Sequence, residues 1–158
     1  MKKQFLIIFI LIFVNTFSIF YKDVKGHAYS LEDFTWDDNV LIFSRYSTNE
    51  NYLKIIKYIS GKIKATFSLI FITDLSKIKT TDYNLVNHNL ETIKTKGNII
   101  LDWKGYAGKN FKIKYTNKNL EFFIIFFNTG IKKSNSIIIK NDDKYQKIIS
   151  KQLKKLNL

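Results

Sequence analysis

Apolar residues along this chain form short continuous runs separated by a stretch of helical periodicity, and this pattern predicts a mixed α/β domain. The run Val40 to Phe43 is apolar at every position, which is typical of a strand buried on both faces of a sheet. After a polar turn, Ser47 stands three residues before Glu50, which favours a capping box at a helix start. The expected buried stripe of that helix is Tyr52, Ile55, Ile56, Ile59 and Ile63.

A second buried strand is predicted over Ala65 to Thr73, directly before Asp74. If this strand lies parallel to the first, the helix between them is a right-handed crossover. The segment Leu75 to Asn98 is polar and lysine-rich, and its pattern predicts no element. Ile99 to Trp103 favours a further strand or a packed loop, and Lys109 to Tyr115 favours a short helix.

The last third of the chain predicts a hairpin followed by a helix. Leu120 to Phe127 is strongly apolar, Asn128 to Gly130 has turn composition, and Ile137 to Ile139 returns as the second strand. The polar residues 132–136 suggest a loose hairpin. Asn141, Asp142 and Asp143 are suited to cap a closing helix. Its expected apolar face is Tyr145, Ile148, Ile149, Gln152 and Leu156.

The first 28 residues have the composition of a targeting segment. Lys2 and Lys3 precede a mostly apolar run from Phe5 to Phe20, and the small residues Gly26 and Ala28 fit a signal peptidase site. A cleaved secretory signal over 1–28 is one interpretation, and an uncleaved membrane anchor over residues 5–20 is the other. We therefore expect an exported domain over 30–152, periplasmic or secreted, with a short tail at 153–158.

Composition excludes several kinds of chemistry. The 158 residues contain no cysteine and no proline, so disulfides, thiolate nucleophiles and zinc–thiolate sites are excluded. The net charge is +13, but Arg45 is the only arginine, and guanidinium groups dominate specific phosphate and base recognition. We therefore expect no nucleic-acid partner, although a basic surface can attract anionic lipids or envelope polymers.

No cofactor or metal site is expected. His88 has no second ligand near it in the sequence, so a surface position is expected for it. The segment 105–109 lacks the spacing and the hydroxyl residue of a phosphate-binding loop.

Candidate binding residues follow the two predicted parallel strands. Arg45 and Tyr46 follow the first strand and Asp74 follows the second, and the carboxyl ends of parallel strands are where α/β folds bind ligands. Arg45 and Asp74 are expected to meet, either as a functional pair or as a partly exposed ion pair. Trp36 is a fourth candidate: it either stacks on a ligand or covers the core where the chain enters the sheet.

The predicted order is a βαβ half followed by a ββα half, which is the order of a thioredoxin-like three-layer sandwich with a mixed sheet. In that fold the redox cysteines lie at the start of the first core helix, where this chain has Arg45 to Thr48. A hydroxyl cannot replace the thiolate that this chemistry needs. We therefore expect no thiol-based redox activity.

The segments leading to Trp36, the run Asn39 to Phe43, the strand end at Asp74 and the hairpin Phe123 to Ile139 resemble one family. It is the domain of unknown function 4174, which comprises mostly secreted, thioredoxin-like bacterial proteins related to domains of animal extracellular-matrix proteins. The resemblance covers about Ser30 to Gln152 and implies the fold and export, without an activity.

Two hypotheses of function remain. The first is an exported binding or structural module whose partner is a protein or an envelope polymer, with a membrane involved only if the N-terminal segment is uncleaved. The alternative is an enzyme or small-anion-binding protein with a non-thiol site near Arg45 and Asp74, although no nucleophile has a base beside it in the sequence.

Overall fold

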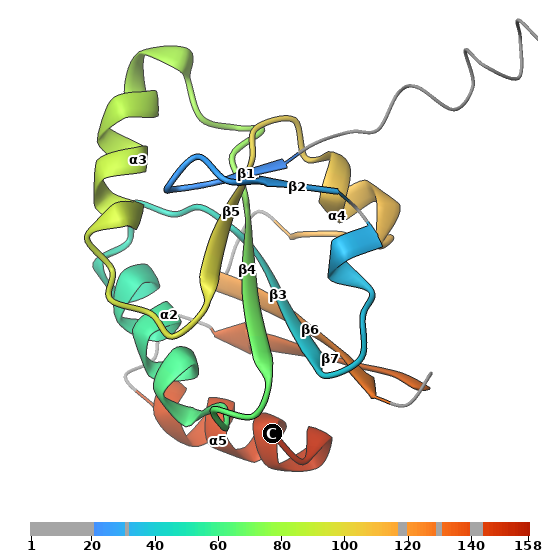
Figure 1. Ribbon diagram of the computed structural model, residues 1–158. Coiled ribbons are helices and arrows are strands. Elements are labelled where there is room, and N and C mark those ends of the chain that lie inside the picture. The colour runs from blue at the N-terminus through green and yellow to red at the C-terminus, as the bar shows by residue number, and fades with distance from the viewer. Residues whose placement is uncertain (1–20, 31, 117–119, 129–130, 140–143) are drawn as a thin grey trace, which may run out of the picture.

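A single seven-stranded mixed sheet organises the protein, seen in a computed structural model that describes residues 21–30, 32–116, 120–128, 131–139 and 144–158 (Figure 1). The strand order is β2-β1-β5-β4-β3-β6-β7. The strands are β1 (Tyr21–Asp23), β2 (Ala28–Tyr29), β3 (Asn39–Arg45), β4 (Ser68–Asp74), β5 (Asn98–Asp102), β6 (Leu120–Asn128) and β7 (Ile131–Ile139). The helices are η1 (Glu32–Phe34), α2 (Glu50–Lys62), η2 (Thr80–Asp82), α3 (Tyr83–Glu91), α4 (Tyr106–Asn110) and α5 (Tyr145–Leu156).

The topology confirms the predicted βαβ and ββα halves. Strands β3, β4 and β5 are parallel, whereas β6 is antiparallel to β3, and β7 is antiparallel to β6. Helix α2 links β3 to β4, so the chain makes the crossover that the sequence predicts.

Alternate residues of the central strands face two apolar layers. Val40 and Ile42 pack with α2, α3 and α5, and every residue of the predicted α2 stripe is buried. Leu41 and Phe43 face the other side, where Phe34 of η1 and Ala107 of α4 are buried. Figure 1 shows the longer helices α2, α3 and α5 on one side of the sheet and the short helices α4 and η1 on the other.

The start of α2 differs from the predicted capping box. Asn49 is the N-cap, and its side-chain oxygen accepts a hydrogen bond from Asn51 N at 2.9 Å. The Ser47 hydroxyl instead accepts a hydrogen bond from Asn49 N at 3.1 Å. The prediction was wrong because both Ser47 and Asn49 are residue types that can cap a helix, and the helix begins after Asn49.

The middle of the chain contains two helices, α3 and α4, whose positions its sequence pattern did not predict. Helix α3 lies within the segment for which no element was predicted, and His88 is exposed there, as expected. The short helix is α4, which begins at Tyr106, and the predicted helix over Lys109 to Tyr115 is wrong. Lys112 has a φ of 58°, a left-handed conformation that an α-helix cannot continue through.

The β6–β7 hairpin is regular rather than loose. Residues pair without interruption from Leu120 opposite Ile139 to Asn128 opposite Ile131. Strand β7 tolerates polar residues because it is the edge of the sheet.

Strand β4 starts at Ser68, three residues later than predicted. The expected turn at Thr129–Gly130 and the expected cap over Asn141 to Asp143 lie outside the described residues.

Both ends of the domain extend beyond the expected boundaries. Strand β1 pairs with β5, and its Tyr21 and Asp23 are buried, so the sheet begins before the expected cleavage site at Ala28. At the other end, Leu153 and Leu156 of α5 are buried, and residues 153–156 are therefore helix rather than tail. In the described part of the chain no helix has the length and apolarity to cross a membrane, and residues 5–20 lie outside that part.

Candidate functional site

The carboxyl ends of β3 and β4 bring Arg45 and Asp74 together, as the sequence predicts. The two residues are register partners in the sheet, and Arg45 Nε lies 3.6 Å from Asp74 Oδ2. Asp74 is only 5% exposed, and its Oδ1 accepts a hydrogen bond from Ser76 N at 2.9 Å. The carboxylate is therefore already occupied by groups of its own chain.

Tyr115 covers this ion pair. The Arg45 guanidinium lies 5.0 Å from the centre of the Tyr115 ring, a cation–π distance. Burial and the negative charge of Asp74 raise the pKa of Tyr115, so its hydroxyl stays neutral. Arg45 is thus held between a carboxylate and an aromatic ring, which is the arrangement of a packed structural pair.

Asp102 occupies the matching place at the end of β5. Its carboxylate accepts hydrogen bonds from Tyr106 N and Ala107 N, each at 2.9 Å, at the start of α4. Burial raises the pKa of Asp102, and these backbone hydrogen bonds oppose the rise. The amides that an external phosphate would need are therefore used by Asp102.

Tyr46 lies on the other side of β3, against the start of α2. It is buried, its ring packs edge-on to Tyr52 at 5.5 Å, and its hydroxyl accepts a hydrogen bond from Asn89 Nδ2 at 3.2 Å. The Tyr52 hydroxyl contacts Ser44 Oγ at 2.9 Å, and burial raises the pKa of Tyr52 to about 12. These phenols therefore fix α2 against the sheet and α3.

A groove of about 340 Å³ opens beside Tyr46, between the start of α2 and the η2–α3 segment. Leu85 is 63% exposed and lies on its wall. Residues at the start of α2 lie across the groove from Leu85, and its surface is mainly apolar. The lining residues are Tyr46, Ser47, Thr48, Asn49, Glu50, Leu53, Ile78, Asp82, Leu85, Val86 and Asn89.

Trp36 does not belong to this region. Its carbonyl accepts a hydrogen bond from Asn39 N, so it lies at the amino end of β3, opposite to Arg45. Its side chain is 68% exposed, and the interpretation of Trp36 as a cover for the core is wrong. The four candidate residues therefore separate into a packed pair, a groove residue and a distant exposed ring.

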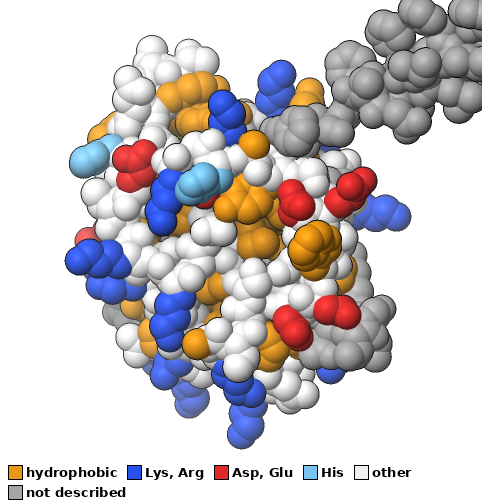
Figure 2. Space-filling view, viewed as in Figure 1, with side chains coloured by type: hydrophobic (Ala, Val, Ile, Leu, Met, Phe, Trp, Pro, Cys, Tyr) orange, Lys and Arg blue, Asp and Glu red, His pale blue; other side chains and the backbone are white. Residues whose placement is uncertain are grey.

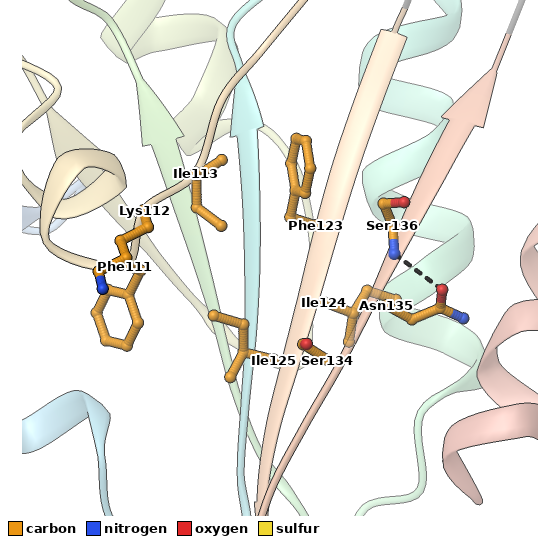
Figure 3. A pocket seen from close by; sticks show the side chains of 9 residues that line it. All are labelled: Phe111, Lys112, Ile113, Phe123, Ile124, Ile125, Ser134, Asn135 and Ser136. Atoms are coloured by element: carbon orange, nitrogen blue, oxygen red, sulfur yellow. Dashed lines mark hydrogen bonds between the residues drawn. The ribbon is translucent and has the colours of Figure 1, made fainter.

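A second hollow, of about 410 Å³, lies on the opposite face of the sheet (Figure 3). It is bounded by residues 111–113 and by β6 and β7. Phe123 points into it, whereas the Asn135 side chain, which accepts a hydrogen bond from Ser136 N at 2.9 Å, points toward α5 and donates to Gln152 Oε1 at 2.7 Å. Lys112 is the charged residue of this lining, which offers no acid–base pair for chemistry.

Sequence reasoning missed Asp102, Tyr115 and Leu85. Asp102 follows an apolar run just as Asp74 does, so the same rule would have found it. Leu85 and Tyr115 carry no such signal, because they lie in polar segments whose packing only the tertiary structure reveals.

The strand order and the position of α2 define a thioredoxin-like fold, and comparison with solved structures agrees. A putative thiol:disulfide interchange protein DsbE from Chlorobium tepidum has a TM-score of 0.57 at 15% identity, over 87% of this chain and 92% of that one. The pneumococcal exposed lipoprotein thioredoxin Etrx1 of Streptococcus pneumoniae has a TM-score of 0.56 at 12% identity, over 87% and 98%.

An uncharacterized thioredoxin-like protein from Porphyromonas gingivalis is similar to the same degree, with a TM-score of 0.56 at 14% identity over 88% and 89% of the two chains. No protein-family model matches the sequence, and no curated protein matches it. Likeness at these identities shows the fold, and this chain has that fold without a cysteine.

Proposed function

We propose that this protein is an exported, redox-inactive thioredoxin-like module that binds a protein partner through the groove beside Tyr46. The observation that carries the proposal is the groove itself. It opens at the start of α2, and in the thioredoxin-like fold the residues at this place carry the chemistry. This chain has hydroxyl and amide side chains there.

The groove is suited to an extended peptide with an apolar side chain. Leu53, Ile78 and Leu85 supply an apolar wall, and exposed apolar surface rimmed by polar groups is typical of interaction sites. Glu50 and Asp82 are the charged lining residues, so the groove is acidic within a basic protein. We therefore expect the bound segment to be neutral or basic beside its apolar residue.

Export is supported by the apolar segment Phe5 to Phe20 after Lys2 and Lys3. One structural neighbour is described as an exposed lipoprotein, which is consistent with this proposal. Membership of the family of domain of unknown function 4174 is part of the same proposal, and the thioredoxin-like fold supports it.

The alternative, a small-anion or enzymatic site at Arg45 and Asp74, has less support. Asp74 is nearly inaccessible, Arg45 is engaged by Asp74 and Tyr115, and neither Arg45 nor Asp74 lines the groove. Replacing Arg45 by Ala and Asp74 by Asn tests it: this alternative requires that the two changes abolish a melting shift induced by an added anion.

Photo-crosslinking in the producing cell tests the groove. A photoreactive residue at Leu85 should yield one discrete adduct, and the same residue at Ile138, which is 47% exposed on the edge strand, should not. Thr48→Trp should remove the Leu85 adduct by filling the groove, whereas Lys57→Trp, on the exposed surface of α2, should leave it.

An adduct that survives Thr48→Trp would show that the partner lies elsewhere. Reduction of insulin disulfides by the purified protein, without an added thiol, would show that the module is not redox-inactive.

A further inference from the structure

A second surface combines aromatic rings with lysines at the carboxyl end of β5. We call it the Trp103 patch, and it consists of Lys22, Trp103, Lys104, Tyr106 and Lys109. Lysines are scattered over the face seen in Figure 2, so charge alone does not identify a site. At this patch Lys104 Nζ and Lys109 Nζ lie 5.9 and 5.4 Å from the centre of the Tyr106 ring, which is itself 39% exposed.

The loop that carries the patch is held in one conformation. Asp102 fixes the backbone of Tyr106, and Gly105 N donates a hydrogen bond to the Asp102 carbonyl at 3.3 Å. Gly105 has a φ of 67°, which glycine adopts without strain. The Trp103 ring is supported by Tyr83, whose ring centre lies 4.0 Å away. The half-buried Trp103 ring and the exposed Tyr106 ring are therefore held in fixed positions.

A hollow of about 310 Å³ lies between these rings and β1. Its walls are mainly apolar, and Asp102, which is 2% exposed, is the acid among the described residues that line it. The exposed charges at its rim are the ammonium groups of Lys22 and Lys104. The lining residues are Tyr21, Lys22, Leu101, Asp102, Trp103, Lys104 and Tyr106.

The apolar segment that precedes Tyr21 and Lys22 suggests a membrane as the partner of the patch. Tyr21 and Lys22 line the hollow, and they directly follow the apolar segment Phe5 to Phe20. The chain therefore enters the folded domain at the patch. If that apolar segment inserts into a bilayer, during export or as an anchor, the patch is the part of the domain that meets the bilayer surface.

We propose that the Trp103 patch docks on a membrane surface that contains anionic phospholipid. Tryptophan and tyrosine prefer the boundary between headgroups and acyl chains, and lysines near that boundary are attracted to anionic headgroups. An apolar hollow with few hydrogen-bonding groups suits acyl chains better than the hydroxyls of a glycan. This surface is separate from the groove at Tyr46, so it does not depend on the proposed peptide partner, but it rests on the export that is part of the proposed function.

Fluorescence of the full-length protein tests the proposal, because the chain has only two tryptophans. Trp36→Phe leaves Trp103 as the single reporter. With vesicles of phosphatidylcholine and phosphatidylglycerol in equal parts, Trp103 emission should shift to the blue, and brominated lipids should quench it. Vesicles of phosphatidylcholine alone should give a much smaller shift, and added salt should weaken the response.

Charge reversal supplies the matched comparison. Lys104→Glu with Lys109→Glu, in the Trp36→Phe background, should remove most of the shift. Lys147→Glu with Lys151→Glu changes the net charge equally on the exposed surface of α5 and should leave the shift intact. Melting curves of both variants check that each is folded.

Three results would overturn the proposal. The first is Trp103 emission that is unchanged by anionic vesicles. The second is a shift that does not depend on headgroup charge or on Lys104 and Lys109. The third is an equal shift with inorganic phosphate or a single-stranded oligonucleotide, which would assign the patch to a soluble anion.

Discussion

At the scale of single residues, the Tyr52 hydroxyl links the candidate site to the stability of the fold. It is fully buried, and it contacts Ser44 Oγ at 2.9 Å and Thr73 Oγ1 at 3.4 Å, on the two central parallel strands. Its ring also supports Tyr46, which lines the groove. A buried phenol with hydrogen-bond partners on both strands fixes the start of α2, and ionisation would break that arrangement.

We predict that Tyr52→Phe changes the alkaline limit of stability. Burial raises the pKa of Tyr52 from 10.0 to about 12, so the unfolded chain loses this proton first. The contribution of the neutral phenol is therefore complete below pH 10 and is lost as the pH rises toward 12. At neutral pH the variant should be less stable by about 1 kcal/mol, for the lost hydrogen bond.

Between pH 10 and 12 the stability of the wild type, measured against that of Tyr52→Phe, should fall by about 2–3 kcal/mol. Urea unfolding of both proteins across this interval measures the difference in stability. The lysines and the other tyrosines titrate in both proteins, so their contributions cancel in that difference. A difference that stays constant with pH would contradict the assigned shift.

At the scale of elements, the sequence predicted the strands and the helix that bury long apolar faces. It missed α3 and the groove wall at Leu85, which depend on contacts between distant segments. The continuous apolar runs at Val40–Phe43 and Leu120–Phe127 favour strands buried on both faces, and the α2 stripe has the spacing of one buried helix face. Helix α3 was missed because it buries only Val86 and Leu90, too few apolar residues for a periodic signal. The register that joins Arg45 to Asp74 could be inferred, whereas the groove wall at Leu85 depends on how α3 packs.

A pair of glycines tests the packing between neighbouring elements. A Cβ at Gly97, just before β5, would lie 2.2 Å from the Leu69 carbonyl oxygen at the start of β4. Since backbone cannot yield as a flexible side chain does, Gly97→Ala should lower the free energy of unfolding by about 1–3 kcal/mol. Within α2, a Cβ at Gly61 meets no atom within 4 Å.

Gly61→Ala should therefore raise the free energy of unfolding by about 0.5–1 kcal/mol, since alanine favours the helix. Denaturant melts of the two variants measure both effects under the same conditions. Equal effects of the two substitutions would show that the approach of Gly97 to β4 is not close in solution.

At the scale of the whole molecule, strand β1 decides where the folded domain begins. Its Tyr21 is 4% exposed and packs on Phe34, with ring centres 5.5 Å apart. The Asp23 carboxylate accepts hydrogen bonds from Lys25 N and His27 N, both at 2.9 Å, which ties β1 to β2. Cleavage after Ala28 would remove this strand and leave β5 as an open edge of the sheet.

We therefore predict that processing, where it occurs, leaves Tyr21 in the mature protein. A chain that begins at Tyr21 should unfold cooperatively with native stability. A chain that begins at Tyr29 should be less stable by at least about 3 kcal/mol, which is the usual cost of deleting one buried aromatic side chain. The loss of the β1–β5 pairing adds to this cost.

Urea unfolding compares the two chains, and N-terminal sequencing of the protein from its producing cell locates the mature end. A mature protein that begins at Tyr29 and is as stable as the longer chain would show that β1 is dispensable and would return the domain boundary to Ala28.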